Sequence, residues 1–310
     1  MEISLLLMQQ IAQLFLILIM GYAVVKAGLL KASDSRVLSV VMVYLVTPCV
    51  IINAFQIDDT PEIRKGLLYS MAIAAAIHVV LLVLSALLSR PLKLDAVEQV
   101  NVIYSNAAAL VIPLVKALMG DAYVIYSCAF IIVQLVLLWT HASSLLQGSS
   151  ALDWKKVLTN INMIAIAAGA LLYWFRVVLP APLQNTMSTV GNMMGPMGML
   201  LAGMAIAEKP LREGFCTCRN YLPTVLRLVV CPLVVLVLLW VCHASSWVAD
   251  GKNILMTVYL SAITPACATV TSMAQLYDRD ASHSSAIYVL STLLSILTMP
   301  LMIGLFELLL

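Results

Sequence analysis

The sequence predicts an all-α polytopic membrane protein with ten transmembrane helices, arranged as two inverted repeats of five helices. Three observations support this fold class. Hydrophobic residues make up 63% of the 310 residues and charged residues only 10%, whereas soluble domains contain about 25% charged residues. The apolar residues gather in ten segments, each near the ~20 residues that a helix needs to cross a bilayer. Two of these segments, one in each half, combine small polar residues with a proline.

The ten expected spans are divided equally between two halves of the chain. The first five are residues 5–25, 37–55, 67–88, 97–119 and 122–143, and the second five are residues 157–178, 183–207, 221–242, 253–277 and 283–308. We expect residues 1–146 to form the first repeat, residues 147–156 a polar hinge, and residues 157–310 the second repeat. Because five is odd, the second repeat enters the membrane from the opposite face, so the pseudo-two-fold axis lies in the membrane plane.

The ninth span contains the stretch Tyr259–Tyr277, which is dense in Ser, Thr and Ala and includes Pro265. Pro265 has no N–H group to donate to the carbonyl of Ser261, and its ring crowds that turn, so we expect the helix to break there. The fourth span contains a counterpart, Tyr104–Ala117, in which we expect a break at Pro113. Interrupted helices in corresponding positions of two halves usually indicate the binding site of a transporter.

The distribution of basic residues between loops predicts the orientation. Eleven of them lie in the odd-numbered loops: Lys26, Lys31, Arg36, Arg90, Lys93, Lys155, Lys156, Lys209, Arg212, Arg219 and Arg279. Four lie in the even-numbered loops: Arg64, Lys65, Arg176 and Lys252. Since basic loops stay in the cytoplasm, we expect a multi-pass protein of the cell membrane with both termini outside and a cytoplasmic hinge.

Several segments resemble the auxin efflux carrier family, which includes plant PIN-type carriers and bacterial carriers of malate or malonate. GYAVVKAGLL and LVTPCVIINAF are similar to the first two spans of that family, and VLRLVVCPL is similar to its eighth span. The most specific piece is TPACATVTSMAQLYDRDASHSSAIYVLSTLLSILTMPL, residues 264–301, which resembles the ninth and tenth spans. The resemblance covers nearly the whole chain.

This resemblance implies ten spans in two inverted repeats, with broken helices 4 and 9 crossing at the midplane. It also implies a scaffold of spans 1, 2, 6 and 7 and a mobile transport unit of the other six. The family's fourth span usually contains Asn-x-Gly-x-x-Gly-x-Pro. Here Asn106 and Pro113 are in place, but Ala108 and Val111 stand where the glycines would be. Because glycine permits close backbone approach, these replacements predict a narrower or more apolar crossing.

The residues around the two expected breaks are the candidate substrate-binding residues. Asn106 offers amide donors and an acceptor at membrane depth, and its alternative role is to cap the broken backbone. Thr264 lies opposite Asn106 when the repeats are aligned with a shift of 158 residues. A hydroxyl in a membrane helix often bonds a carbonyl one turn earlier, which is the alternative for each threonine. The full set is Ser105, Asn106, Pro113, Thr264, Pro265, Cys267 and Thr269.

The expected breaks predict a site for an anion. Half-helices that begin at the crossing present free N–H groups and partial positive charge, and the crossing contains no Asp or Glu. The coupling ion is open: His78, near the middle of the third span, is a candidate for proton coupling or a packing residue, backbone carbonyls could bind sodium, and uniport is a further alternative. Lys116, one turn after Pro113, could pair with the anion or extend to the outer interface. We expect no cofactor and no metal site.

Three functions are consistent with these features. The first is a secondary transporter that moves a small organic anion, a mono- or dicarboxylate, by alternating access that is elevator-like. The second is a membrane sensor that binds a solute on the same fold without transporting it. The third is a membrane-embedded enzyme, which is disfavoured because the spans contain no catalytic motif. The expected partners are the anion, the lipid bilayer and a coupling proton or sodium, with no nucleic acid; the alternatives of monomer and homodimer stay open.

Overall fold

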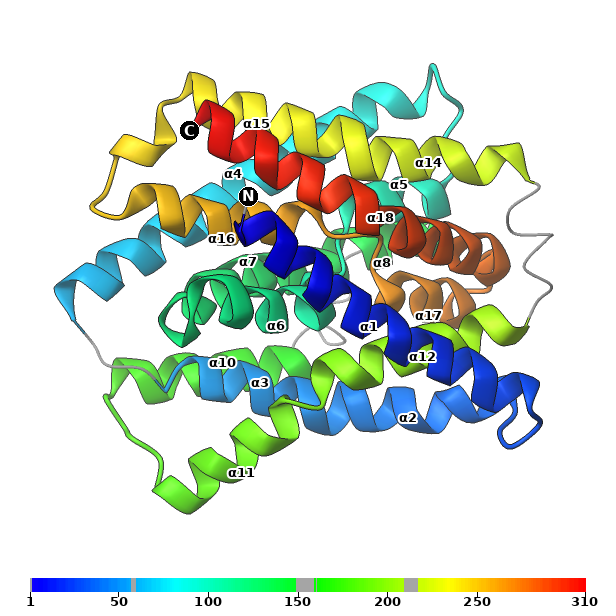
Figure 1. Cartoon of the computed structure of the whole chain (residues 1–310), viewed down its shortest axis with the longest axis horizontal. Helices are drawn as coiled ribbons and strands as arrows, with labels where there is room; N and C mark the ends of the chain where they lie inside the picture. The colour runs from blue at the N-terminus through cyan, green and yellow to red at the C-terminus, as the bar shows by residue number, and fades with distance from the viewer. Residues whose placement is uncertain (1, 57–59, 149–158, 160, 209–216) are drawn as a thin grey trace.

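The computed structural model describes residues 2–56, 60–148, 159, 161–208 and 217–310. Within these residues the chain is all-helical, and the single β-type contact is an isolated antiparallel bridge between Ser105 and Ala266. Within the described residues, each of the ten expected spans overlaps one helix or a consecutive set of helices (Figure 1). The all-helical prediction is therefore confirmed. Most of the predicted hinge, residues 149–156, lies outside the described residues.

In the first half, span 1 is α1 (Glu2–Lys26) and span 3 is α4 (Pro61–Ser89). Three spans are composite. Span 2 is α2 (Ser35–Val41), the π-helical η2 (Met42–Val46) and α3 (Thr47–Ala54); span 4 is α5 (Ala96–Ile103) and α6 (Ala107–Met119); span 5 is α7 (Val124–Leu137), the π-helical η4 (Leu138–Ala142) and α8 (Ser143–Gln147).

In the second half, span 6 is α10 (Ile161–Trp174) and span 10 is α18 (Ala281–Leu309). Three spans are again composite, and two of them, spans 7 and 9, correspond in order to the composite spans 2 and 4. Span 7 is α11 (Ala181–Gly191) and α12 (Met194–Glu208); span 8 is α14 (Tyr221–Val225), the π-helical η6 (Leu226–Val230) and α15 (Cys231–Val241); span 9 is α16 (Gly251–Ile263) and α17 (Ala268–Leu276).

Local sequence signals explain where several helices begin. Thr60 precedes Pro61 at the start of α4, and its hydroxyl accepts a hydrogen bond from the N–H of Ile63 at 3.2 Å. Asp95 and Glu98 form a reciprocal capping box at the start of α5. Asp280 accepts the N–H of His283 at 2.9 Å and begins α18, as expected for an acidic N-cap.

The helices fall into two groups by their contacts. The four-span group contains α1, α2, α3, α10, α11 and α12, in which α1 lies along α12 and α3 contacts α10 and α11. The six-span group contains α4 to α8 and α14 to α18, and its helices enclose the largest apolar core. In Figure 1, α1 and α12 cross the face of the six-span group beside α6, α17 and α18. A smaller apolar cluster joins the groups there, with Leu18 and Met199 on one side and Leu110, Tyr288 and Val289 on the other.

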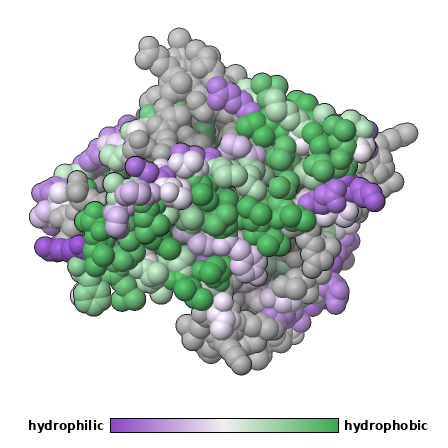
Figure 2. Space-filling view, turned by 90° about the horizontal axis from the view of Figure 1, so that it is seen from below, coloured by the Kyte–Doolittle hydropathy of each residue, from purple (hydrophilic) through white to green (hydrophobic). Residues whose placement is uncertain are grey.

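The outer surface is apolar over wide areas. Leu68, Val79, Val83 and Leu87 are exposed along α4, and Trp174 at the end of α10 is 81% exposed. Figure 2 shows hydrophobic side chains in broad patches on the face seen from below. A soluble monomer rarely exposes apolar patches of this extent. Among the described residues, four helical stretches are long and apolar enough to cross a bilayer: Pro61–Ser89, Val124–Gln147, Cys218–Val241 and Ala281–Leu309.

The contact between α1 and α12 depends on glycine. A Cβ atom added to Gly203 would lie 1.9 Å from the carbonyl oxygen of Leu18 and 2.8 Å from the nitrogen of Tyr22. We therefore expect Gly203→Ala to destabilise the protein by about 1–3 kcal/mol or more, since two backbones must separate. The matched control is Gly304→Ala on α18, where nothing lies within 4 Å of the added atom. Equal melting temperatures of the two purified variants would contradict this packing.

Candidate functional site

The two broken spans meet at one level in the interior of the six-span group. The break in span 9 is where the sequence predicted it: α16 ends at Ile263, and α17 begins at Ala268 after Pro265. The predicted break at Pro113 is wrong. Span 4 breaks about two turns earlier, at Tyr104–Asn106, and α6 continues through Pro113 to Met119. A proline removes one helical hydrogen bond, and a membrane helix can tolerate this without ending.

The two breaks are joined by backbone hydrogen bonds. The N–H of Asn106 donates to the carbonyl of Pro265 at 2.8 Å, and the N–H of Cys267 donates to the carbonyl of Tyr104 at 3.1 Å. These two bonds flank the antiparallel bridge between Ser105 and Ala266. The broken helices therefore cross at the bridge. Backbone N–H and C=O groups that have no helical partner in one break are paired with backbone groups of the other break.

Side chains from other helices pair the remaining backbone groups of the bridge. The carboxamide of Gln134, on α7, accepts the N–H of Ser105 at 3.0 Å and donates to the carbonyl of Ser105 at 2.7 Å. The hydroxyl of Ser105 also donates to Gln134, at 2.6 Å. On the other strand, the N–H of Ala266 donates to the hydroxyl of Ser291, on α18, at 3.1 Å. Hydrogen bonds from α7 and α18 thus hold the non-helical backbone of both breaks in place.

Arg227 is the largest fully buried side chain and lies at the carbonyl ends of both broken helices. Its guanidinium donates to the carbonyls of Val102 and Ile103 at the end of α5, each at 3.1 Å. It also donates to the carbonyl of Thr264 at 3.0 Å and to that of Ala262, at the end of α16. Its hydrogen-bond partners within the described part of the chain are backbone carbonyls and include no carboxylate. Sequence reasoning missed this residue, although a charged residue inside a span is itself a signal of function.

The structure places the predicted site residues close together but gives them different surroundings. Asn106 is 4% exposed, and its side-chain nitrogen has no partner among the described residues. Thr264 is fully buried, and its hydroxyl donates to the carbonyl of Ser261 at 3.1 Å, which is the alternative bond expected for a membrane threonine. Ser105 is bonded to Gln134, Cys267 is buried beside the bridge, and Thr269 is half-buried in the first turn of α17.

His78 is fully buried on α4, and it forms no hydrogen bond to the residues of the bridge within the described part of the chain. Its Nδ1 is 2.7 Å from the carbonyl oxygen of Ala74, one turn earlier in α4, and its ring packs against Phe130 with centroids 4.6 Å apart. The other ring nitrogen has no hydrogen-bond partner among the described residues. Gln134, which is hydrogen-bonded to Ser105 in the crossing, is also a near neighbour of His78.

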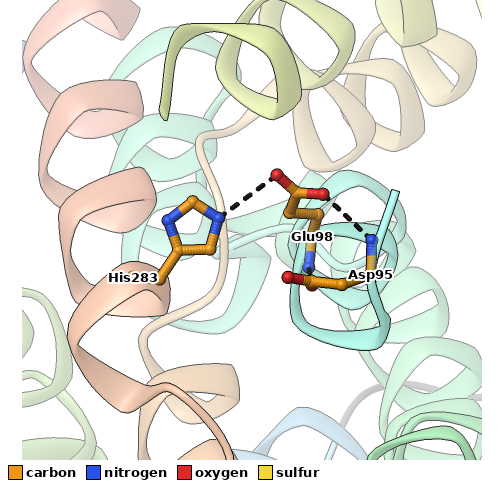
Figure 3. A group of neighbouring side chains, drawn as sticks. All are labelled: Asp95, Glu98 and His283. Atoms are coloured by element: carbon orange, nitrogen blue, oxygen red, sulfur yellow. Dashed lines mark hydrogen bonds and ion pairs between the residues drawn. The ribbon is translucent and has the colours of Figure 1, made fainter. Parts of the chain in front are cut away.

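A second polar cluster lies at the beginning of α5, two turns before the break (Figure 3). Asp95, Glu98 and His283 bring oxygen and nitrogen atoms within 4.8 Å of one another, a geometry that could hold a metal ion. Arg219, however, bonds both carboxylate oxygens of Glu98 at 2.5 Å, and His283 contacts one of them at 3.2 Å. The guanidinium already neutralises the buried carboxylate, so the cluster ties α5 to α18 and to the loop before α14 as an ion pair.

Two cavities lie along the helices that meet at the crossing, and no residue of the bridge lines either of them. The larger, of about 600 Å³, opens between the ends of α6, α16 and α18, and its lining includes Met119, Lys252, Leu260 and Glu307. Leu260 is one turn from Thr264. The smaller cavity, of about 20 Å³, lies between α1, α6, α12 and α18 and is lined mainly by apolar residues such as Leu110 and Met199. It is large enough for about one water molecule and too small for an organic solute.

Discontinuous helices that cross in the interior, with irregular backbone enclosed by protein, define the class of membrane carriers with broken helices. The family model described as membrane transport protein matches residues 6–153 and again residues 149–303. The chain belongs to this family, which is the auxin efflux carrier family that its motifs resemble. No curated protein matches the chain significantly. The protein is thus a membrane transporter of a family that is generally non-enzymatic.

Proposed function

We propose that the protein is a secondary carrier for a small organic anion, a mono- or dicarboxylate, and that the anion binds at the crossing of the broken helices. The single observation that supports an anion best is Arg227. A guanidinium stays charged in proteins. Its bonds to four carbonyls place a full positive charge at the crossing, and no ion pair with an acidic side chain is formed by Arg227 within the described part of the chain.

Helix dipoles strengthen this argument. A helix end has a partial charge of roughly half an elementary charge, positive at the N-terminus and negative at the C-terminus. Arg227 is bonded to the two negative ends, those of α5 and α16. The two positive ends, those of α6 and α17, begin directly after the bridge and have no acidic residue in their first turns. They therefore attract an anion, whose charge would balance that of Arg227.

The proposed transport cycle uses two inverted five-helix repeats and two units. The two successive matches of the family model, which meet at residues 149–153, support a division of the chain into similar halves. The four-span group corresponds to the scaffold and the six-span group to the transport unit. Since the small cavity between them has no room for an organic anion, we propose that α1 and α12 separate from α6 and α18 during an elevator-like movement.

A binding screen followed by a transport assay tests the proposed function. Purified protein is heated with a panel of mono- and dicarboxylates, because a ligand at about 100 times its Kd adds about 2.7 kcal/mol of stability. A carboxylate that raises the melting temperature is then supplied to sealed vesicles that contain the protein. Uptake above that of empty vesicles is the expected result. Binding without uptake would support a sensor, and a panel without any binder would contradict the proposal.

The proposed orientation places both termini outside the cell and the 147–156 hinge in the cytoplasm. In a variant without native cysteines, single cysteines are introduced at Glu2 or at Ser149. A membrane-impermeant maleimide added to intact cells should label the first position and miss the second, because eleven basic residues are in the predicted cytoplasmic loops and four in the outer loops. Labelling of position 149 with protection of position 2 would reverse the orientation.

Proton coupling through His78 is the second proposal about the cycle, based on its mid-span position and its contact with Gln134. If a proton on His78 drives transport, His78→Gln should remove the dependence of uptake on a pH gradient, since glutamine forms hydrogen bonds but does not titrate. The measurement compares uptake with and without the gradient at equal protein levels. A variant that keeps the wild-type dependence shows that His78 is a packing residue.

A further inference from the structure

Two hydrogen-bond donors at the crossing, one in the break of span 4 and one on α18, are buried without a partner among the described residues. The side-chain nitrogen of Asn106 and the hydroxyl of Tyr288 are both unpaired among the described residues, although the two residues are only 4% and 3% exposed. A buried polar group left unpaired is costly, so native proteins pair nearly all of them with protein, water or a ligand. The burial of these two unpaired donors therefore needs an explanation.

The two unpaired donors are neighbours. The phenol of Tyr288, on α18, interacts with the side chains of Asn106, Thr292 and Cys267, although none of these contacts meets the geometry of a hydrogen bond. Thr292 instead donates its hydroxyl to the carbonyl of Tyr288 at 2.7 Å. The phenol of Tyr288 thus lies close to Asn106, the residue that directly precedes α6.

Tyr288 lies where the four-span group meets the six-span group. It packs in the small apolar cluster with Leu110 of α6, and with Leu18 and Met199 of the four-span group. Ala268, the first residue of α17, packs against the same cluster. The two unpaired donors and the positive ends of α6 and α17 therefore lie together at the boundary between the two helix groups. The 20 Å³ cavity is close by, because its lining includes residues one turn further along α6 and α18.

We propose that Tyr288 is a substrate-binding residue, which together with Asn106 donates hydrogen bonds to the anionic oxygen atoms of the transported solute. This inference rests on the proposed function and extends it to a helix that the sequence did not implicate. An amide N–H and a phenol O–H are both donors, so a carboxylate, which accepts from up to four directions, satisfies both. Hydrogen bonds to a charged acceptor are shorter and about twice as strong as neutral ones.

The test is a comparison of Tyr288→Phe with wild type and with Tyr259→Phe. Tyr259 is also a buried tyrosine of the six-span group, but its hydroxyl already donates to the carbonyl of Pro232 at 3.3 Å. Acetate, malate and malonate are the probes, and affinity is measured from the rise in melting temperature with concentration. Tyr288→Phe should weaken binding by about tenfold or more, and Tyr259→Phe should leave it within twofold.

A second readout separates binding from a structural role. Without a carboxylate, Tyr288→Phe should melt no lower than wild type, because it removes a hydroxyl that has no partner among the described residues. A lower melting temperature would show a structural partner for the hydroxyl and overturn the inference. The inference would also be overturned if Tyr288→Phe kept the wild-type affinity for the carboxylate while Asn106→Ala bound it weakly. That result would leave the proposed function intact. If wild type binds none of the three probes, the site and the proposed function fall together.

Discussion

Replacing Arg227 with leucine should prevent the protein from folding into a stable, monodisperse form. Four backbone carbonyls at the ends of α5 and α16 depend on its guanidinium. Each buried acceptor left unpaired costs about 1–3 kcal/mol, so the sum approaches the ~5–15 kcal/mol that stabilises a typical native protein. The measurement is the yield and melting temperature of purified protein, with size-exclusion chromatography to detect aggregates.

Two comparison variants make the effect of Arg227 specific. Arg90→Leu makes the same chemical change at an exposed position after α4 and should leave the melting temperature nearly unchanged. Arg227→Lys keeps the charge but provides a compact ammonium instead of the planar fork, so it should be intermediate in stability. If Arg227→Leu is as stable as Arg90→Leu, the guanidinium is not what holds the two carbonyl ends together.

The sequence predicted the break in span 9 because its cause is local. Pro265 cannot donate to Ser261, and the small side chains around it let another backbone approach. The break in span 4 was misplaced because its cause is distant in the chain. It is fixed at Tyr104–Asn106 by the carbonyl of Pro265 and by Gln134. Pro113 indicated a broken span correctly but gave the wrong position within it.

Some features of the interior leave a signal in the sequence and others do not. Arg227 is visible in the sequence as a charge inside an apolar span, which is a signal of function, but its four carbonyl partners lie on two other spans and do not follow from its position. The spacing of Asp95 and Glu98 is that of a capping box, a pattern that predicts a helix start. Tyr288 gave no such signal. One tyrosine in a long apolar helix could face any neighbour until the packing of α18 is known.

The candidate residues of the crossing were predicted as a group more accurately than as individuals. Asn106 and Thr264 both lie at the crossing, but the hydroxyl of Thr264 is engaged within its own helix while the amide nitrogen of Asn106 is not. Composition and prolines predict which spans are interrupted. Which side chain remains unpaired depends on side-chain rotamers and on the other helices that pack against the crossing. Neither can be read from the order of residues along one span.

Asn106→Ala should weaken binding of the transported anion by about tenfold or more while the protein still folds and reaches the membrane. Its side-chain nitrogen is buried at the crossing and has no partner in the part of the chain that the structure describes. Removal of one hydrogen bond to a charged group costs about 1.5–3 kcal/mol, and about 1.4 kcal/mol corresponds to tenfold in affinity. The measurement is the affinity for the carboxylate that binds wild type, followed by uptake into vesicles at equal protein levels.

The matched control for Asn106→Ala is Ser85→Ala on α4. The hydroxyl of Ser85 is likewise buried and unpaired among the described residues, but it lies away from both breaks. The pair of variants therefore tests whether the location of an unpaired group matters, rather than its presence. If Asn106→Ala binds and transports as well as Ser85→Ala, the crossing is not the binding site. If Asn106→Ala fails to fold while Ser85→Ala folds normally, Asn106 supports the broken backbone, and the anion must bind through other groups.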